Sequence, residues 1–357
     1  MRAVFAVEEL VRRDLQGLKP YNPHYAPDVI RLDANENPLD FPAEVKDYII
    51  SGMGKQFFGR YPDPLARDLV SQLAAHFGVG TENIMVGNGS DELILDIMLA
   101  FGAGKRVIIA SPTFSMYAIH ARVAGAVPVD VPRGPDFEVD IGAMIKAAGD
   151  EPGVMVLCNP NNPSGNATDV RDIGAIAGSV KSLLVVDEAY VEFGGESCVP
   201  LLDKYPNLAV MRTFSKAFGL AGMRVGYLLA DSRVVRELLR IKQPFNVNSF
   251  SQLAARSAMR FKDLMAAQVR EIIGLRNSLA QKLREVPGVK LYPSETNFIL
   301  FNTVRPEDEV HRELLDKGVM VRYIEAPGRG KFLRVSVGTQ RENDVFLDSL
   351  RSVLTGG

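Results

Sequence analysis

Short runs of apolar residues alternate with segments of helical spacing through much of the chain. Runs of this kind, bounded by turn residues, are typical of buried strands, and they lie at residues 29–32, 84–86, 107–110, 127–131, 154–157, 183–186, 208–211 and 225–229. Helical spacing is found at residues 43–54, 65–77 and 91–101. Apolar strands separated by helices predict a mainly parallel sheet with helices on both faces. We therefore expect an α/β fold whose large domain, three α/β/α layers, occupies residues 43–245.

The pattern changes after Asp231. A long helical region at 249–285, with a break expected at Gly274, is followed by shorter strands at 298–301, 319–322 and 332–337, and a last helix begins near Arg341. This predicts a smaller α+β domain at residues 246–357, completed by residues 1–42. The first 20 residues have the spacing of a short amphipathic helix, and a proline-rich extended segment follows them.

Polar clusters follow several of the predicted strands, and ligands bind at the carboxyl ends of strands in sheets of this kind. The segment 213–224 lies between two apolar runs and contains Ser215, Lys216 and Arg224. A partly desolvated lysine amine in a tight turn forms a Schiff base with a carbonyl, and an arginine beside a hydroxyl binds a phosphate. The segment suggests a lysine that holds pyridoxal phosphate. The alternative is a solvated Ser-Lys pair at the surface.

Asp187 ends an apolar run that has no polar residue in its last four positions, so we expect its side chain to be partly buried. A buried carboxylate needs a cationic partner. A pyridinium nitrogen is such a partner, because the carboxylate keeps that nitrogen protonated and able to draw electrons. Tyr190, three residues on, is placed to donate to the phenolate oxygen of the same ring. The alternative for Asp187 is a helix or turn cap.

Further candidates lie near other strand ends. The glycine turn at 87–91 allows close backbone approach, Ser90 is a candidate helix cap, and the free N–H groups suit a phosphate, although a plain capped turn is the alternative. Asn162 either donates to the phenolate oxygen or satisfies its own backbone in a turn. Phe114 either stacks on a ring face or fills the core. Arg334 either forks onto a carboxylate or phosphate or lies exposed on its strand.

Composition narrows the classes of function. The 357 residues suggest about two domains, and a net charge of -2 leaves no basic excess to attract nucleic acid or anionic membranes. Two cysteines, Cys158 and Cys198, form no Cys-x-x-Cys pair, and the four histidines have no metal-ligand spacing. The first 18 residues lack the apolar core of a signal peptide. We expect a cytoplasmic protein with no metal, nucleic-acid or membrane partner.

In this order and spacing, the segments resemble those of the fold-type-I pyridoxal-phosphate-dependent aminotransferases. The resemblance covers nearly the whole chain and rests on Asn-Pro-Ser-Gly at 162–165, Asp-Glu-Ala-Tyr at 187–190 and the lysine segment at 215–224. Within that superfamily the chain is most similar to the histidinol-phosphate aminotransferases, at residues 18–21, 32–38, 60–64 and 333–339. That similarity implies histidine biosynthesis, with amino transfer from L-histidinol phosphate to 2-oxoglutarate and pyridoxal 5'-phosphate as cofactor.

The resemblance also implies a role for each candidate residue. Lys216, Asp187 and Tyr190 are the implied catalytic residues: Lys216 forms the Schiff base and moves the proton, Asp187 holds the ring nitrogen, and Tyr190 contacts the phenolate oxygen. The other implied cofactor contacts are Asn162 at that oxygen, Phe114 on the ring face where tyrosine is frequent, and, around the phosphate, Ser90, Asp91, Thr213, Ser215, Arg224 and Tyr61 from the partner subunit. A contact from the partner implies an obligate homodimer.

The substrate-binding residues implied by the resemblance are Tyr21, Asn162, Arg322 and Arg334. Arg334 would bind the substrate phosphate in one half-reaction and the glutamate carboxylate in the other, since a guanidinium fork suits both anions.

Three alternatives stay open. An aromatic amino-acid aminotransferase would use the same anion anchors, and a phosphothreonine decarboxylase of the same superfamily should differ at residues 19–21. A non-enzymatic sensor that keeps the cofactor fold usually adds a basic helix-turn-helix module, for which this chain has neither spare length nor charge.

Overall fold

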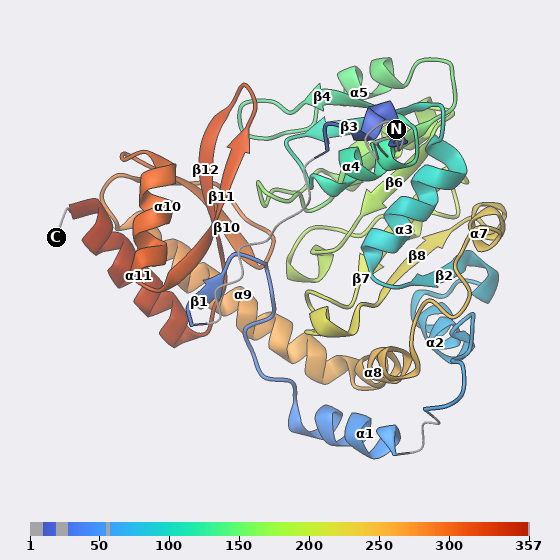
Figure 1. Ribbon diagram of the computed structural model, residues 1–357, viewed down its shortest axis with the longest axis horizontal. Helices are drawn as coiled ribbons and strands as arrows, with labels where there is room; N and C mark the ends of the chain where they lie inside the picture. The colour runs from blue at the N-terminus through green and yellow to red at the C-terminus, as the bar shows by residue number, and fades with distance from the viewer. Residues whose placement is uncertain (1–9, 19–27, 55–57, 356–357) are drawn as a thin grey trace, which may run out of the picture.

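The computed structural model describes residues 10–18, 28–54 and 58–355. It contains two sheets that lie side by side, and the long helix α9 (Lys262–Arg284) runs from beneath the larger sheet to the smaller one (Figure 1). Within these residues, no helix is both long and apolar enough to cross a membrane.

The larger sheet has seven strands in the order β2-β8-β7-β6-β5-β3-β4. Its strands are β2 (Ile84–Gly87), β3 (Arg106–Ser111), β4 (Val127–Pro132), β5 (Val154–Cys158), β6 (Leu183–Asp187), β7 (Leu208–Thr213) and β8 (Gly226–Ala230). Only β8 runs against its neighbours, β2 and β7, and the remaining pairs are parallel. The prediction of a mainly parallel sheet is therefore confirmed.

Helices cover both faces of this sheet because alternate residues of each strand enter different cores. In β5, for example, Val154 and Val156 pack on one side and Met155 and Leu157 on the other. The first face is covered by α3 (Ser90–Ile97), α4 (Met116–Val123) and α7 (Ser232–Leu239). The second is covered by α2 (Arg67–Phe77), α5 (Ile141–Ala148), α6 (Val170–Ser179) and α8 (Ser249–Arg260). The predicted three-layer arrangement is confirmed.

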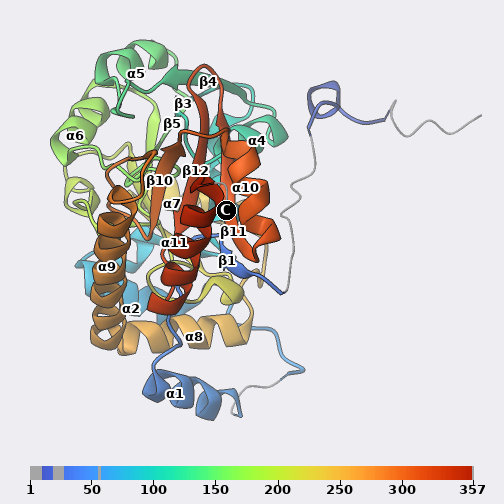
Figure 2. The ribbon, with the colours of Figure 1, turned by 90° about the vertical axis from the view of Figure 1, so that its left-hand side faces the viewer.

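The smaller sheet has five strands in the order β1-β11-β12-β10-β9. These are β1 (Ile30–Leu32), β9 (Val289–Leu291), β10 (Phe298–Thr303), β11 (Val319–Ala326) and β12 (Gly330–Ser336). β1 comes from the N-terminal part of the chain and pairs in parallel with β11, whereas the other pairs are antiparallel. One face packs on α9, α10 (Glu307–Asp316) and α11 (Gln340–Thr355) (Figure 2).

We expected the long helical region to break at Gly274. It breaks instead at Phe261, which separates α8 from α9. Ala254, Ala255 and Ala258 of α8 pack into the core beneath the larger sheet, whereas the end of α9 packs on the smaller one. The chain therefore has to turn between these two contacts. A glycine in a helix only lowers its propensity, so Gly274 is tolerated inside α9.

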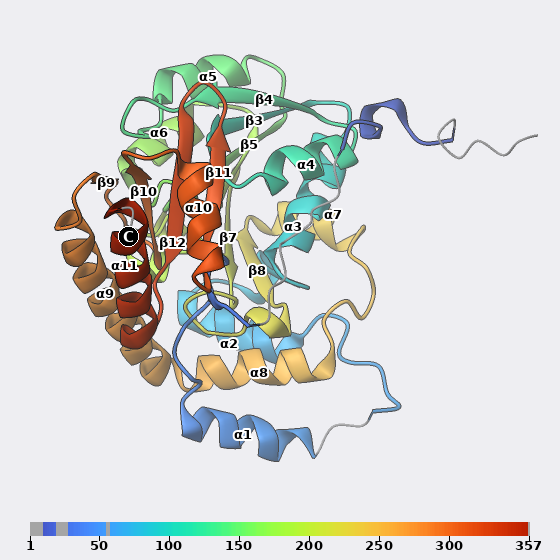
Figure 3. The same cartoon turned by 60° about the vertical axis from the view of Figure 1, so that its left-hand side comes forward.

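α8 lies between α1 (Ala43–Met53) and the larger sheet (Figure 3). A helix that follows residue 245 thus shares a core with α2. The division into domains at 43–245 and at 1–42 with 246–357 stays a prediction. β9 and α10 were not predicted, because β9 has three residues and α10 buries only Val310 and Leu314 on an otherwise polar surface.

The close approach of two backbones brings the start of α3 against β8. A Cβ atom on Gly226 would lie 2.6 Å from the backbone nitrogen of Ser90 and 2.7 Å from the carbonyl carbon of Gly89. We expect Gly226→Ala to lower the free energy of unfolding by about 1–3 kcal/mol, because backbone atoms cannot rotate away from the added methyl group. Urea denaturation measures the change.

Gly222→Ala is the matched control, since Gly222 lies in the connection that leads into β8 and has no atom within 4 Å of the added Cβ. It should leave the free energy of unfolding unchanged or raise it slightly. Equal losses in the two variants would contradict the close-packing explanation.

Candidate active site

Lys216 lies in the tight connection between β7 and β8. The backbone N–H of Phe214 donates to the carbonyl of Val225, and that of Gly219, at a φ of 62°, donates to the carbonyl of Lys216 at 3.1 Å. These bonds close the turn and hold the lysine at the strand ends. Its Nζ donates to the carbonyl oxygen of Ala34 at 3.0 Å and lies 6.0 Å from the centre of the Tyr190 ring.

The Lys216 amine has a lowered pKa. Burial, reinforced by the positive charge of Arg334, lowers its pKa to about 8, although the carboxylates of Glu36 and Asp91 act in the opposite direction. A lysine with this pKa has a substantial neutral fraction near neutral pH, and the neutral amine is the form that attacks a carbonyl or takes a proton.

Asp187 lies at the end of β6 and is buried. Its carboxylate accepts hydrogen bonds from the Tyr117 hydroxyl at 2.7 Å and from the backbone N–H of Ala189 at 3.1 Å. Burial raises the pKa of Asp187 to about 6, and the bond from Tyr117 limits the rise. The bond to Ala189 means that the turn-capping alternative holds in part, but no Lys, Arg or His forms an ion pair with Asp187 among the described residues. A cationic ring nitrogen would fit that site.

One hydrogen-bonded network joins Tyr190 to residues of both sheets. The Tyr190 hydroxyl accepts from the side-chain amides of Asn35 at 3.0 Å and Asn162 at 3.5 Å. The oxygen of Asn162 in turn accepts from Arg334 at 2.6 Å. Arg334 is buried rather than exposed, so the surface alternative for it is wrong. Asn162 likewise bonds other side chains and not its own backbone, which places Asn162, Tyr190 and Arg334 in one group.

The start of α3 and the β7–β8 connection form a second group. Arg224 donates to the Ser215 hydroxyl at 3.4 Å and to a carboxylate oxygen of Asp91 at 3.2 Å. Ser90 is not the helix cap that we expected: it is the first residue of α3, Gly89 stands at the cap position, and no side chain caps the helix. The uncapped N–H groups and Arg224 suit a phosphate. Thr213, which ends β7, donates instead to the carbonyl of Val225 and accepts from the N–H of Ser215.

The remaining predicted residues have different positions. Phe114 is partly buried and meets the Tyr117 ring edge-on, with ring centres 5.6 Å apart. Arg322 of β11 lies directly opposite Arg334 of β12 in the antiparallel pair. Tyr61 is 81% exposed and stacks on Phe245 at 4.4 Å, so it is not buried with the Lys216 group. Tyr21 lies outside the described residues.

Three residues of the site were missed. Tyr117 bonds Asp187, Asn35 bonds Tyr190, and Asn297 donates to the backbone carbonyl of Asn35 at 3.0 Å. Tyr117 could have been found from its spacing, because it lies one helical turn after Phe114. Asn35 belongs to a polar turn and adopts a left-handed φ of 55°, which asparagine tolerates. Nothing local marks Asn297, since its partner is 262 residues away.

The lowered pKa of Lys216 predicts a pH dependence for the cofactor-free protein. Because only the neutral amine reacts, labelling of Lys216 by a small aldehyde and borohydride should rise with pH through a midpoint of about 8 and then level off. A lysine in a model peptide keeps rising to about pH 10.4. Mass spectrometry of the labelled peptide measures the midpoint, and Lys216→Met controls for other lysines. A midpoint above pH 10 would contradict a partly buried amine at this position.

Comparison with known proteins places the chain in a family. The model of the family described as aminotransferase class I and II matches residues 27–350. Histidinol-phosphate aminotransferase 1 of Carboxydothermus hydrogenoformans is 43% identical over 94% of this chain and 96% of its own. The histidinol-phosphate aminotransferase of Thermoanaerobacter sp. (strain X514) is 40% identical over 98% of this chain and 99% of its own.

A solved structure agrees with these relatives. The histidinol-phosphate aminotransferase of Sinorhizobium meliloti, in complex with pyridoxal-5'-phosphate, superposes with a TM-score of 0.89 at 27% identity, and the match covers 100% of both chains. With a half-buried lysine, a buried aspartate and an uncapped helix start at the strand ends, and a family model that spans nearly its whole length, the chain belongs to the class I and II aminotransferases.

Proposed function

We propose that this protein is a pyridoxal-phosphate-dependent transaminase that moves an amino group between L-histidinol phosphate and 2-oxoglutarate, giving imidazole-acetol phosphate and glutamate, in histidine biosynthesis. Relatives named histidinol-phosphate aminotransferase match nearly the full chain. The observation that carries the proposal is the convergence of a half-buried Lys216 amine with a lowered pKa, the Tyr190 hydroxyl and the Arg334 guanidinium on one site.

The described residues fit the cofactor. When bound, pyridoxal phosphate supplies an aldehyde that joins to an amine and a protonated ring that accepts the electrons of the bond broken at the substrate α-carbon. We assign Asp187 to the ring nitrogen, Tyr190 and Asn162 to the phenolate oxygen, and Phe114 to a ring face. We assign the cofactor phosphate to the backbone N–H groups of Ser90 and Asp91 and to the side chains of Thr213, Ser215 and Arg224.

Lys216 has two tasks in this assignment. Its Nζ holds the cofactor before the amino donor enters, and afterwards the freed neutral amine takes the proton from the α-carbon of the donor. General-base transfer of this kind is typically worth about 100- to 10,000-fold in rate. The lowered pKa of Lys216 suits the task, because a base with a pKa near the working pH is both deprotonated and strong enough.

Two arginines support an anionic substrate. Arg322 and Arg334 stand directly opposite each other on β11 and β12, and like charges in that position destabilise a sheet. An anion bound to both side chains would offset the repulsion. A phosphate and a carboxylate each accept the two parallel bonds of a guanidinium, so one pair of arginines serves the donor in the first half-reaction and 2-oxoglutarate in the second.

A comparison of substrates tests the function. With 2-oxoglutarate as acceptor, the purified enzyme should turn over L-histidinol phosphate with a higher kcat/KM than phenylalanine or tyrosine. It should release no carbon dioxide from phosphothreonine. Lys216→Ala should abolish turnover and the visible absorbance of the bound cofactor. A preference for phenylalanine, or decarboxylation of phosphothreonine, would replace the proposed substrate with one of the two related activities, and full turnover by Lys216→Ala would remove the lysine from its role.

We also propose that the enzyme is a homodimer in which Tyr61 serves the partner subunit. Tyr61 and Phe58 are exposed aromatic side chains that pack on Phe245 and Phe250, and exposed apolar groups of this kind mark interaction surfaces. Tyr61 also lines a cavity of about 230 Å³ with Asp63, Asp68 and Arg256. Its exposure suits a contact across a two-fold axis better than a contact within its own chain.

Subunit complementation tests this arrangement. Lys216→Ala and Tyr61→Ala should each have little activity alone. Mixed at equal amounts after reversible dissociation, they should recover roughly one quarter of native activity, because half of the dimers are mixed and each of these has one complete site. Light scattering reports the dimer itself. No recovery despite mixed dimers would show that Tyr61 acts in its own subunit or not at all.

The cellular location belongs to the same proposal. Cys158 and Cys198 are both buried and unpaired, which suits a reducing compartment such as the cytoplasm. The expected lack of nucleic-acid and membrane partners still rests on the charge of the sequence.

A further inference from the structure

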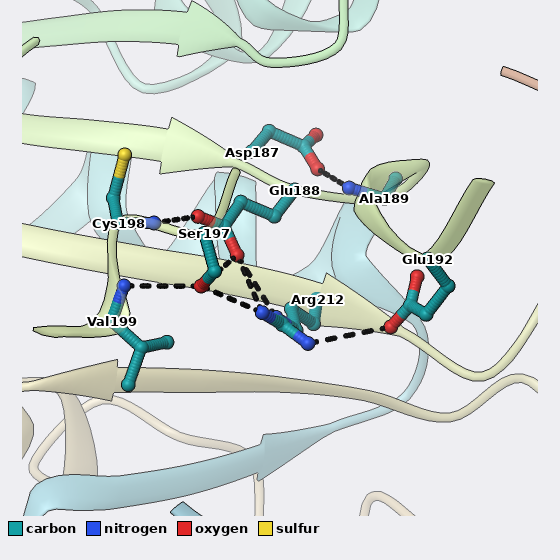
Figure 4. Close-up of polar contacts among 8 residues, drawn as sticks. All are labelled: Asp187, Glu188, Ala189, Glu192, Ser197, Cys198, Val199 and Arg212. Carbon is teal, nitrogen blue, oxygen red and sulfur yellow. Dashed lines mark hydrogen bonds and ion pairs between the residues drawn. The ribbon is translucent and has the colours of Figure 1, made fainter. Parts of the chain in front are cut away.

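A cluster of buried charges lies behind the carboxyl ends of β6 and β7 (Figure 4). Arg212, from β7, donates through Nε to a carboxylate oxygen of Glu188 at 3.0 Å, and its Nη2 forms an ion pair with the same oxygen at 2.8 Å. Its Nη1 lies 3.4 Å from Glu192, and its Nη2 also donates to the Ser197 hydroxyl at 2.8 Å. The other carboxylate oxygen of Glu188 accepts from the backbone N–H of Cys198. None of these side chains has a part in the proposed reaction so far.

Two residues of the cluster are sequence neighbours of residues that we assign to the cofactor site. Glu188 directly follows Asp187, and Arg212 directly precedes Thr213. Successive side chains of extended backbone point to opposite faces, and Figure 4 shows the Asp187 carboxylate directed away from Arg212, toward Ala189. Arg212 thus ties the end of β6 to β7 from the face opposite the one that Asp187 uses.

Charge balance in the cluster depends on Arg212. The Glu188 side chain is fully buried and that of Arg212 is 10% exposed. Burial raises the pKa of Glu192, which Arg212 opposes, and the second carboxylate oxygen of Glu192 is buried with no hydrogen-bond partner among the described residues. Burial by itself disfavours the charged form of Arg212, but Tyr227, Glu192 and Glu188 together raise its pKa above the usual value. Without it, two carboxyl groups would share a dry site with no cation.

Other titratable groups lie around Arg212 and around Asp187. Arg212 is faced by Glu188 and Glu192, by Tyr227 of β8 and by His76 of α2. Asp187 is faced by Tyr117 of α4, Cys158 of β5, Asp91 of α3, Tyr190 and Glu188. Apart from Arg212 and His76, every member of these two sets is acidic or neutral. A charge left uncompensated on Glu188 would therefore add to the groups that already disfavour ionised Asp187.

We propose that Arg212 is a positioning residue of the lysine site: by neutralising Glu188 and joining β6 to β7, it keeps Asp187 ionised and in place for a cationic ring nitrogen. The proposal rests on the proposed function, because it needs pyridoxal phosphate as the ligand. It adds a residue that touches neither cofactor nor substrate and acts through the carboxylate beside it in the chain.

Cofactor affinity as a function of pH tests the proposal. The cofactor-free protein is titrated with pyridoxal phosphate across about pH 5.5 to 9, and the dissociation constant is measured by ultrafiltration. In the native protein, affinity should fall as the pH drops through the Asp187 pKa of about 6. In Arg212→Met the fall should begin about one pH unit higher, because Glu188 is left as an uncompensated like charge. The cofactor's own titration is common to all proteins compared.

Four further variants separate charge from mechanical support. Arg212→Lys keeps the cation and should keep the native midpoint. Glu188→Gln removes the like charge and should move the midpoint below the native value, and the double variant with Arg212→Met should return it to near native. Arg305→Met removes an arginine bonded to Glu309 and Glu313 in α10 and should leave the midpoint unchanged.

The outcomes are distinct. A loss of affinity by the same factor at every pH in Arg212→Met, with no return in the double variant, would overturn the proposal in favour of a merely structural ion pair. If Arg212→Met does not fold, Glu188→Gln decides by itself: a lowered midpoint supports the proposal and an unchanged or raised one overturns it. A native protein that binds no pyridoxal phosphate would defeat the proposed function first, and the role of Arg212 with it.

Discussion

The burial of one amine and one carboxyl group at the junction of two sheets is the constraint on which the site depends. Asp187 is buried and Lys216 is half-buried. Burial shifts the pKa of each group in the direction that favours its neutral form, to about 8 for Lys216 and about 6 for Asp187. One pKa unit corresponds to about 1.4 kcal/mol, so keeping the two groups charged near neutral pH opposes folding by roughly 3 kcal/mol each. A ligand that offers an aldehyde to the amine and a cation to the carboxylate would remove both costs, and its binding would stabilise the fold.

The surroundings of these two groups come from distant parts of the chain. The larger sheet contributes the strand ends that hold Asp187 and Lys216. The smaller sheet contributes Arg334 and β1, the strand that precedes Asn35. Asn35 bonds the Tyr190 hydroxyl directly, and Arg334 is linked to it through Asn162. A cluster of apolar residues from α9, β10 and the segment after β6 closes the space behind Tyr190. A shift of one sheet against the other would therefore change the position of Arg334 relative to Lys216.

The chemistry could be predicted from local segments, and the errors show where local reasoning stops. The lysine turn, the aspartate at a strand end and the parallel sheet were all apparent from residues close in sequence. Ser90 was expected to cap α3, but the chain starts that helix one residue earlier than a Ser90 cap requires, so the N–H groups stay open. Arg334 could not be classed as buried or exposed from its strand alone, because its burial depends on Asn162 and Asp33, which lie 172 and 301 residues away. The turn at Phe261 likewise follows from two cores that only the folded chain possesses.

Strand and helix periodicity, the reactive lysine and the aspartate that accompanies it are properties of short segments, because desolvation in an apolar run and the geometry of a glycine turn act over a few residues. The partners of those groups are not. Tyr117 beneath Asp187, Asn35 and Asn297 around Tyr190, and the pairing of Arg212 with Glu188 arise only when separate segments of the chain become neighbours in the fold. Hydrogen bonds and ion pairs in a dry interior act over a few ångströms, and sheet order, rather than sequence distance, decides which side chains come that close.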